Sequence, residues 1–256
     1  MSVRNSSGYY LVLEGPGGAG KSEQIKRLKT RLEAAGREVV LTREPGGTAK
    51  AEAIRGELFR LKAEGNISFE EEIRMVYAAR TFNMFEVVSP ALERGAIVIK
   101  DRDYLSTFVF QIVGATMQGL PRDESMRKLL DWHWKYYVEA GFAQPDNRLI
   151  LLPSEDECLR RKGFVGHMGD GFDMQGAKFM HEIYLEYAEI GCDLLRDRGM
   201  WRGNTNLVDG DFDKAVIEEK IWKEIVIGLG EEVDFEIGQS YRRRDGREMA
   251  RSTWRK

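Results

Sequence analysis

The segment Gly15–Ser22 reads Gly-Pro-Gly-Gly-Ala-Gly-Lys-Ser and fits the pattern G-x-x-x-x-G-K-[ST] of phosphate-binding loops. It follows the apolar, strand-prone run Tyr9–Leu13, and the amphipathic stretch Glu23–Ala34 comes after it. A buried strand that leads into such a loop turns backbone N–H groups and a helix N-terminus toward a polyphosphate. An incidental lysine in a glycine-rich turn is the alternative, but the pattern and both flanks agree on nucleotide binding.

Within this loop each residue type has an expected task. Lys21 would contact the β- and γ-phosphates of ATP, and the Ser22 hydroxyl would ligate Mg²⁺. The other residues predicted to bind ATP are Gly15, Gly17, Gly18, Ala19 and Gly20.

Composition is that of an ordinary enzyme domain. The 256 residues, 42% of them hydrophobic, are enough to bury the core of one α/β domain. The net charge of −3 hides an asymmetry, because the fifteen residues from Arg242 carry +5 and the rest carry −8. Two separate cysteines, the lack of an apolar leader and the lack of a long apolar run predict a cytoplasmic protein with no membrane span.

Strand-like runs alternate with helical stretches along the chain. The runs are rich in Val, Ile and Leu without polar alternation, as expected of strands covered on both faces. They are Tyr9–Leu13, Glu38–Leu41, Ala96–Lys100, Arg148–Leu152 and Asn206–Val208. Capping-box patterns predict helix starts just before Phe69 and Glu155. The order predicts an α/β fold with a five-stranded parallel sheet and crossover helices.

Charged segments follow two of these runs, at the edge where ligands bind in such sheets. Thr42–Thr48 follows the second run, and Asp101–Gln111 follows the third. Arginines there could clamp a second phosphate in bidentate fashion, and Asp101 could hold Mg²⁺ directly or through water. For either segment alone, helix capping and surface ion pairs are the simpler interpretation.

Taken together, these segments resemble the thymidylate kinase family. The similarity runs from about Tyr9 to Leu229, with the motifs in matching order and at matching intervals. Its motifs are the phosphate loop, Thr42-Arg43-Glu44-Pro45-Gly46-Gly47-Thr48, Tyr77-Ala78-Ala79-Arg80, and Asp101-Arg102 followed by Ser106 and Gln111. The resemblance implies a three-layer phosphate-loop kinase at residues 9–229, with a lid at about 160–177. Residues 1–8 would form an N-terminal extension, and 230–256 a basic C-terminal tail.

The resemblance also implies roles for single residues. Arg43 and Arg102 would grip the acceptor phosphate, and Arg80 would face the acceptor base. The full predicted acceptor set is Arg43, Glu44, Pro45, Tyr77, Arg80, Arg102, Ser106 and Gln111, and the predicted catalytic set is Lys21, Asp101, Arg102 and Arg161. Mg²⁺ would be held by Ser22 and Asp101. An acceptor phosphate is already largely ionised at pH 7, so no general base is required.

Several positions depart from the family pattern, and they cluster around the acceptor. Gly17 stands where the family usually has Asp or Glu near the acceptor sugar, Val76 replaces the usual stacking phenylalanine, and Phe110 replaces a tyrosine. The glycine-rich lid retains cations at its start, Arg160, Arg161 and Lys162. The donor chemistry therefore looks intact, whereas the identity of the acceptor stays open.

Three functions remain open from the sequence. The first is transfer of phosphate from ATP to dTMP or a related pyrimidine nucleoside monophosphate, by a protein that the resemblance implies is a homodimer. The second is a kinase for a hydroxyl on a nucleoside or on a modified pyrimidine in DNA, which would need a carboxylate base such as Asp101, Asp103 or Glu44. The third is a nucleotide-binding module without catalysis. The tail is either a solvated extension or a segment that contacts DNA.

Overall fold

The computed structural model describes residues 8–163, 171–190 and 204–229, and it contains the predicted parallel sheet. The strands are β1 (Tyr9–Glu14), β2 (Val39–Arg43), β3 (Ile97–Asp101), β4 (Asn147–Leu151) and β5 (Asn204–Val208). They pair in the order β2-β3-β1-β4-β5, and every pair is parallel. Each predicted strand run is confirmed. The expectations for residues 1–7, for 164–170 of the lid and for the tail from 230 lie outside the described residues.

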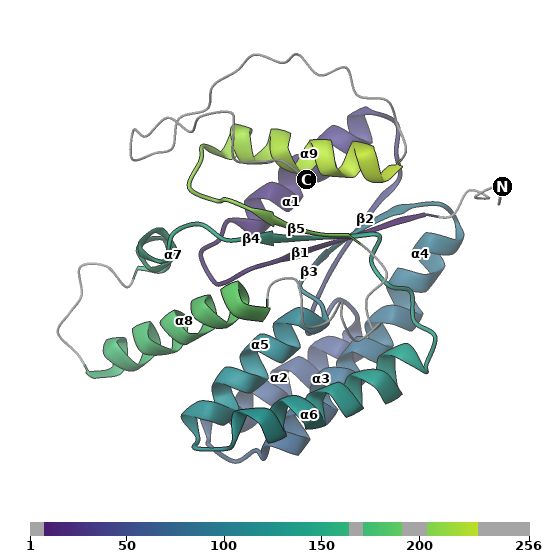
Figure 1. Cartoon of the computed structure of the whole chain (residues 1–256). Helices are drawn as coiled ribbons and strands as arrows, with labels where there is room; N and C mark the ends of the chain where they lie inside the picture. Colours follow the sequence, from purple (N-terminus) through teal and green to yellow (C-terminus); the bar gives the residue numbers. More distant parts are fainter. Residues whose placement is uncertain (1–7, 164–170, 191–203, 230–256) are drawn as a thin grey trace.

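Helices cover both faces of the sheet (Figure 1). Helices α1 and α9 lie on one face, and the group around α3 and α5 lies on the other, which gives the three layers of the expected α/β kinase fold. Their bounds are α1 (Lys21–Ala34), α2 (Ala49–Ala63), α3 (Phe69–Asn83), η1 (Met84–Val88), α4 (Ser89–Glu93), α5 (Tyr104–Met117), α6 (Arg122–His133), η2 (Trp134–Val138), α7 (Glu155–Lys162), α8 (Gly171–Ile190) and α9 (Lys214–Leu229).

Strand β1 is the centre of the molecule, and all six of its residues are buried. Successive side chains of a strand point to opposite faces. Tyr10 and Val12 accordingly join the apolar cluster beneath α3 and α5, whereas Leu11 and Leu13 join the cluster beneath α1 and α9. This double burial explains why the run lacks a polar alternation.

The two predicted helix starts are both correct, but only one has the predicted cap. Ser68 and Glu71 form a reciprocal capping box at the start of α3. Helix α7 begins at Glu155 as expected, yet the Ser154 hydroxyl makes no capping bond. The Ser154 hydroxyl and N–H donate instead to the Asp211 carboxylate, at 3.0 and 2.7 Å, which ties α7 to the loop after β5.

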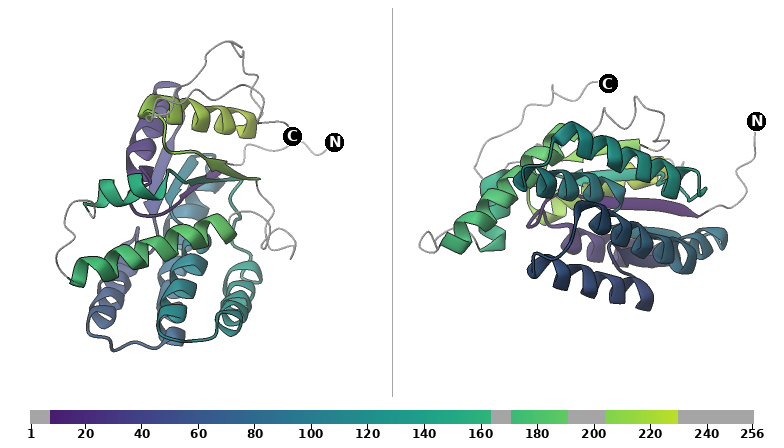
Figure 2. Two further views of the ribbon diagram at one scale, coloured as in Figure 1. Left: turned by 60° about the vertical axis from the view of Figure 1, so that its left-hand side comes forward. Right: turned by 90° about the horizontal axis from the view of Figure 1, so that it is seen from below.

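The topology brings the predicted site segments to one edge. Leu13 pairs with Asp101, and Asp101 pairs with Arg43, so the segments that follow β1, β2 and β3 leave the sheet side by side. Helix α8 packs against α5 and α7 beside them, as Figure 1 and Figure 2 show. No helix in the described part of the chain is long and apolar enough to cross a membrane.

Candidate active site

The phosphate loop holds its lysine in a buried position. Lys21 Nζ donates to the carbonyl oxygens of Gly15 at 2.9 Å and Pro16 at 3.0 Å, and the residue is only 6% exposed. Burial, with the nearby Arg102 guanidinium as the next cause, lowers the pKa of Lys21 to about 7. A bound polyphosphate would favour the charged ammonium, so the arrangement suits an anion at this place.

The glycines of the loop allow it to press against neighbouring backbone. Gly15 has φ +132°, and a Cβ there would lie 2.2 Å from the Leu151 carbonyl oxygen. Gly18 has φ +81°, and a Cβ there would lie 2.5 Å from the Cys158 carbonyl oxygen. These two positions therefore require glycine for both backbone conformation and space. The loop is fixed against β4 and α7 before any ligand binds.

The residues predicted to hold Mg²⁺ fit a hard cation. Ser22 is exposed at the start of α1, and Asp101 Oδ1 is buried without a hydrogen-bond partner. An orphaned carboxylate oxygen near Lys21 is a ligand that Mg²⁺ prefers. The described residues contain no group of three or more His, Cys, Asp or Glu side chains that could hold a metal ion. A magnesium ion here would thus depend on phosphate oxygens and water for its remaining ligands.

Arg102 connects the phosphate loop to the start of α5 and to α8. Its backbone has φ +72°, a left-handed conformation that costs a non-glycine residue about 1 to 3 kcal/mol. Its N–H donates to the Leu13 carbonyl, and its Nη1 donates to Gly15 O at 2.9 Å, Ser106 Oγ at 3.1 Å and Tyr187 Oη at 2.9 Å. The strain is therefore maintained by contacts that place a guanidinium beside the loop.

Glu14 is a site residue that the sequence analysis missed. It ends β1 and is fully buried, and its carboxylate accepts hydrogen bonds from the backbone N–H groups of Asp103 at 2.8 Å and Ser106 at 3.2 Å. It also accepts from Ser106 Oγ at 2.5 Å and Tyr187 Oη at 3.1 Å. Burial raises the pKa of Glu14, whereas Arg102 opposes the rise. Glu14, the last residue of β1, thus caps the N-terminus of α5. In the sequence, only its place directly before the phosphate loop could have indicated that it belongs to the site.

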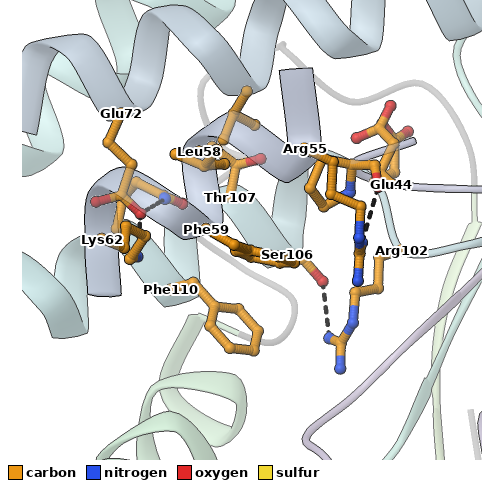
Figure 3. Close-up of a pocket in the computed structure, with 14 residues that line it drawn as sticks. Glu44, Arg55, Leu58, Phe59, Lys62, Glu72, Arg102, Ser106, Thr107 and Phe110 are labelled. Carbon is orange, nitrogen blue, oxygen red and sulfur yellow. Dashed lines mark hydrogen bonds and ion pairs between the residues drawn. The ribbon is translucent and has the colours of Figure 1, made fainter. Parts of the chain in front are cut away.

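A pocket of about 660 Å³, including its open mouth, lies beside Arg102. Figure 3 shows polar groups at its two ends and aromatic side chains between them. The lining residues come from the loop after β2 and from α2, α3 and the segment at the start of α5. They are Glu44, Pro45, Arg55, Leu58, Phe59, Lys62, Glu72, Val76, Arg102, Asp103, Ser106, Thr107, Phe110 and Gln111.

The two ends of this pocket differ in charge. Arg55 and Arg102 lie at the same end, as Figure 3 shows, and Arg102 bonds there to Gly15 of the phosphate loop. At the other end the Glu72 carboxylate pairs with Lys62 and accepts from Gln111 Nε2 at 2.6 Å. An ionised carboxylate only accepts, so the amide of Gln111 must turn its N–H₂ toward Glu72 and leave its oxygen for another donor.

Five of the predicted acceptor residues line this pocket, and three do not. Those in the lining are Glu44, Pro45, Arg102, Ser106 and Gln111. Arg43, Tyr77 and Arg80 are not among its lining residues.

Arg43 lies outside the pocket because of strand alternation. Thr42 and Glu44 on either side of it are buried, whereas the Arg43 side chain is 54% exposed and points to the other face. Its guanidinium makes a bidentate pair with Glu52, at 3.0 and 2.9 Å from Nη2. Arg55, from α2, supplies the second arginine of the pocket, and its Nη1 donates to the Pro45 carbonyl at 2.8 Å.

Arg80 and Tyr77 lie beneath the pocket. Arg80 is 1% exposed, and its guanidinium contacts the Glu44 carboxylate at 2.7 Å and donates to Thr107 Oγ1 at 2.6 Å. It also stacks over the Tyr77 ring, 4.5 Å from the centroid. Glu44 and Thr107 line the pocket, so Arg80 supports its wall from below. Val76, not Tyr77, presents its side chain to the pocket.

Arg161 lies against the other side of the phosphate loop. Its Nη1 donates to the carbonyl oxygens of Gly18 at 3.1 Å and Ala19 at 3.3 Å, and its Nε donates to Glu157 at 2.7 Å. A second hollow opens here. It is lined by Ala19, Gly20, Glu23, Gln24, Arg160, Arg161, Phe212, Lys214 and Ile217.

Comparison with known proteins agrees with this arrangement. The family model described as thymidylate kinase matches residues 13–194. A thymidylate kinase of Burkholderia cenocepacia is 37% identical over 186 residues, which are 71% of this chain and 83% of the relative. One from Pseudomonas fluorescens is 37% identical over 177 residues (69% and 79%), and one from Pseudomonas putida is 34% identical over 183 residues (72% and 81%).

Proposed function

Because the chain belongs to the thymidylate kinase family, we propose that it transfers the γ-phosphoryl group of ATP to dTMP or a related pyrimidine deoxynucleoside monophosphate. The relatives are named for thymidylate, and the phosphate loop and the neighbouring pocket of this chain have the parts that such a reaction needs. The observation that carries the proposal is the pocket itself, with two arginines at the end near Lys21 and an apolar middle.

The acceptor would lie along this pocket. Its phosphate would be bound by the guanidinium groups of Arg55 and Arg102, and its base would lie between Phe59 and Phe110 with its polar edge toward Gln111. This orientation directs the acceptor phosphate toward Lys21 and the donor. Binding of two anions in line, with their charge neutralised, is the main task of a phosphoryl-transfer site.

Magnesium would be held by Ser22 and Asp101 and would neutralise charge on the donor phosphates. The chain's own residues contribute orientation and positive charge. Lys21 binds the donor phosphates, and Arg102, which touches both the loop and the pocket, bridges donor and acceptor.

A hydroxyl acceptor is less well supported, because the pocket lacks a free carboxylate base among its described lining residues. Glu44 is paired with Lys100 and Arg80. Asp103 contacts Lys100 and Arg80 and accepts from Tyr137 at 3.2 Å. These cations hold both carboxylates in ion pairs, away from a substrate proton. A phosphate acceptor needs no such base.

An acceptor panel tests the proposal. The protein is incubated with MgATP labelled in the γ-phosphate and, separately, with dTMP, dUMP, dCMP, UMP, thymidine and a short DNA duplex. We expect label in deoxypyrimidine nucleoside diphosphates. Label in thymidine or DNA alone would replace the proposal with the hydroxyl kinase, and no label in any acceptor would leave a nucleotide-binding module.

The sugar of the acceptor gives a finer prediction. Gly17 provides no carboxylate for a 3′-hydroxyl, and one missing charge-assisted hydrogen bond of about 1.5 to 3 kcal/mol lowers discrimination by roughly 10- to 150-fold. We therefore expect kcat/KM for 3′-deoxy-dTMP to approach that for dTMP. Strong preference for the hydroxyl would show that another group, such as a lid residue, makes this contact.

Assembly remains a prediction from the family. We propose a homodimer, as the resemblance implies. Sedimentation equilibrium at micromolar concentration distinguishes a dimer from a monomer of 29.3 kDa.

A further inference from the structure

Three cations surround the first three residues of the phosphate loop. Lys21 Nζ bonds to the carbonyls of Gly15 and Pro16, and Arg102 Nη1 bonds to the Gly15 carbonyl from the acceptor side. The third is Lys162, the last residue of α7, which lies against Gly17. Like charges gathered this closely repel one another unless an anion lies between them.

Lys162 fills the space where a side chain on Gly17 would stand. A Cβ built on Gly17 would lie 2.6 Å from Lys162 Cε and 3.4 Å from Lys162 Nζ, with Met180 Cε at 3.2 Å. The backbone of Gly17 is not in the left-handed region, unlike Gly15 and Gly18. A side chain at this position would therefore meet the flexible stem of a lysine and not backbone, so that it would displace Lys162 and leave the loop itself unchanged.

The guanidinium of the neighbouring Arg161 is already hydrogen-bonded to other groups of the protein. Its guanidinium bonds to the carbonyls of Gly18, Ala19 and Gly210 and to the Glu157 carboxylate. Lys162 is exposed and, among the described residues, has no hydrogen-bond or ion-pair partner. Of the two cations, Lys162 is the one with an ammonium that remains available to a ligand.

We propose that Lys162 is a second phosphate-binding lysine of this enzyme, and that Gly17, which has no side chain, leaves the space through which this lysine reaches across the loop to the bound phosphates. The inference rests on the proposed phosphoryl transfer and identifies a cation for it. The ammonium contacts an anionic oxygen of the bound phosphates from α7, while Lys21 and Arg102 contact them from the loop and from the acceptor pocket. Arg161 instead holds α7 on the loop and so positions Lys162.

A double-mutant cycle tests the coupling of the two residues. Lys162→Met removes the ammonium, and Gly17→Ala adds a methyl group that must displace it, so each should lower kcat by about 100-fold, as removal of one electrostatic stabiliser does. Since both changes remove the same contact, the double variant should be no slower than Lys162→Met alone. Lys178→Met, which removes an exposed cation from α8, is the matched control and should keep the wild-type rate.

The possible outcomes separate this inference from the proposed function. Lys162 is not a phosphate-binding residue if the wild type phosphorylates dTMP and Lys162→Met does so equally fast. The same conclusion follows if the fall in kcat of the double variant equals the product of the falls in the two single variants. If the wild type phosphorylates no acceptor, calorimetric titration with tripolyphosphate decides the matter. A fall in affinity of about tenfold in Lys162→Met but not in Lys178→Met supports the inference, and equal affinities overturn it. Thermal melting of each variant confirms that the fold is intact.

Discussion

At the scale of single residues, the site is organised around cations that donate hydrogen bonds to backbone carbonyl oxygens of the phosphate loop. Lys21 lies in a buried position and donates to the carbonyls of Gly15 and Pro16, and its pKa falls to about 7. Arg102 is held in a left-handed backbone conformation beside it. Such arrangements are unfavourable in the empty protein and become favourable when phosphates bind, which is characteristic of functional sites.

The lowered pKa of Lys21 predicts proton uptake on ATP binding. At pH 8 the side chain is mostly neutral in the empty site, because the pH lies above its pKa, and the phosphates restore the charged form. Calorimetry in buffers of different ionisation enthalpy should therefore show uptake of a proton at pH 8 that is absent from Lys21→Met. Binding heats at pH 8 that do not depend on the buffer would contradict the assignment.

Turnover should also depend on Lys21. Lys21→Ala removes a cation from the β- and γ-phosphates, and we expect a loss of roughly 100-fold or more in kcat. Urea denaturation should show a much smaller relative effect on stability, because burial already disfavours the charged ammonium in the empty protein. A folded variant with nearly wild-type turnover would refute the phosphate-loop assignment.

The two arginines of the pocket should act on the acceptor. Arg55→Lys or Arg102→Lys keeps the charge but loses the planar fork, so affinity for dTMP should fall by about tenfold while ATP affinity changes less. Arg43→Lys should have a smaller effect on dTMP, because Glu52 holds Arg43 away from the pocket. Calorimetric titration of each variant measures both ligands. The assignment fails if Arg43→Lys weakens dTMP binding more than Arg55→Lys.

At the scale of elements, two helices begin with caps of different kinds. Helix α3 has the local Ser68–Glu71 box on the surface, whereas α5 is capped by the buried Glu14 carboxylate from β1. The local cap could be predicted from a four-residue pattern. The distant cap could not, because its donor groups lie some ninety positions along the chain and meet Glu14 only when β1 pairs with β3.

We expect substitution of the two capping residues to lower the stability of the protein by different amounts. Glu14→Gln replaces a carboxylate, which only accepts hydrogen bonds, by an amide whose N–H₂ group would face the surrounding N–H and O–H donors. The free energy of unfolding should therefore fall by about 1.5 to 3 kcal/mol. Ser68→Ala should cost about 1 kcal/mol. Urea denaturation at neutral pH measures both. If the Glu14→Gln loss is no larger than that of Ser68→Ala, the buried carboxylate does not stabilise α5 as described.

The same contrast explains which parts of the site the sequence could predict. The strand runs are carried by local patterns, and the structure has them where they were expected. Ser106 and Gln111, which the resemblance implies as acceptor residues, both line the pocket. Other features depend on which side of a helix or strand faces the pocket. These features are the presence of Arg55 in the pocket in place of Arg43, the burial of Arg80 beside Glu44, and the Lys62–Glu72 ion pair. The orientation of these side chains is determined by packing between segments that are distant in the sequence.

At the scale of the whole molecule, the phosphate loop separates two hollows. The acceptor pocket lies on the side of α2, α3 and α5, and the second hollow lies between α1, α7 and the segment that begins α9. Sheet order places β1 between β3 and β4, so the loop after β1 stands between the two sides. This position suits transfer of a phosphoryl group from one bound nucleotide to another.

The central claim is this transfer, and one measurement tests it directly. Purified protein is mixed with MgATP and dTMP, and the nucleotides are followed by ³¹P NMR. We expect ADP and dTDP to form in equal amounts, with no inorganic phosphate beyond the background, and we expect Lys21→Ala to abolish both products. Formation of ADP with inorganic phosphate but without dTDP, or no turnover of any nucleoside monophosphate, would contradict the account.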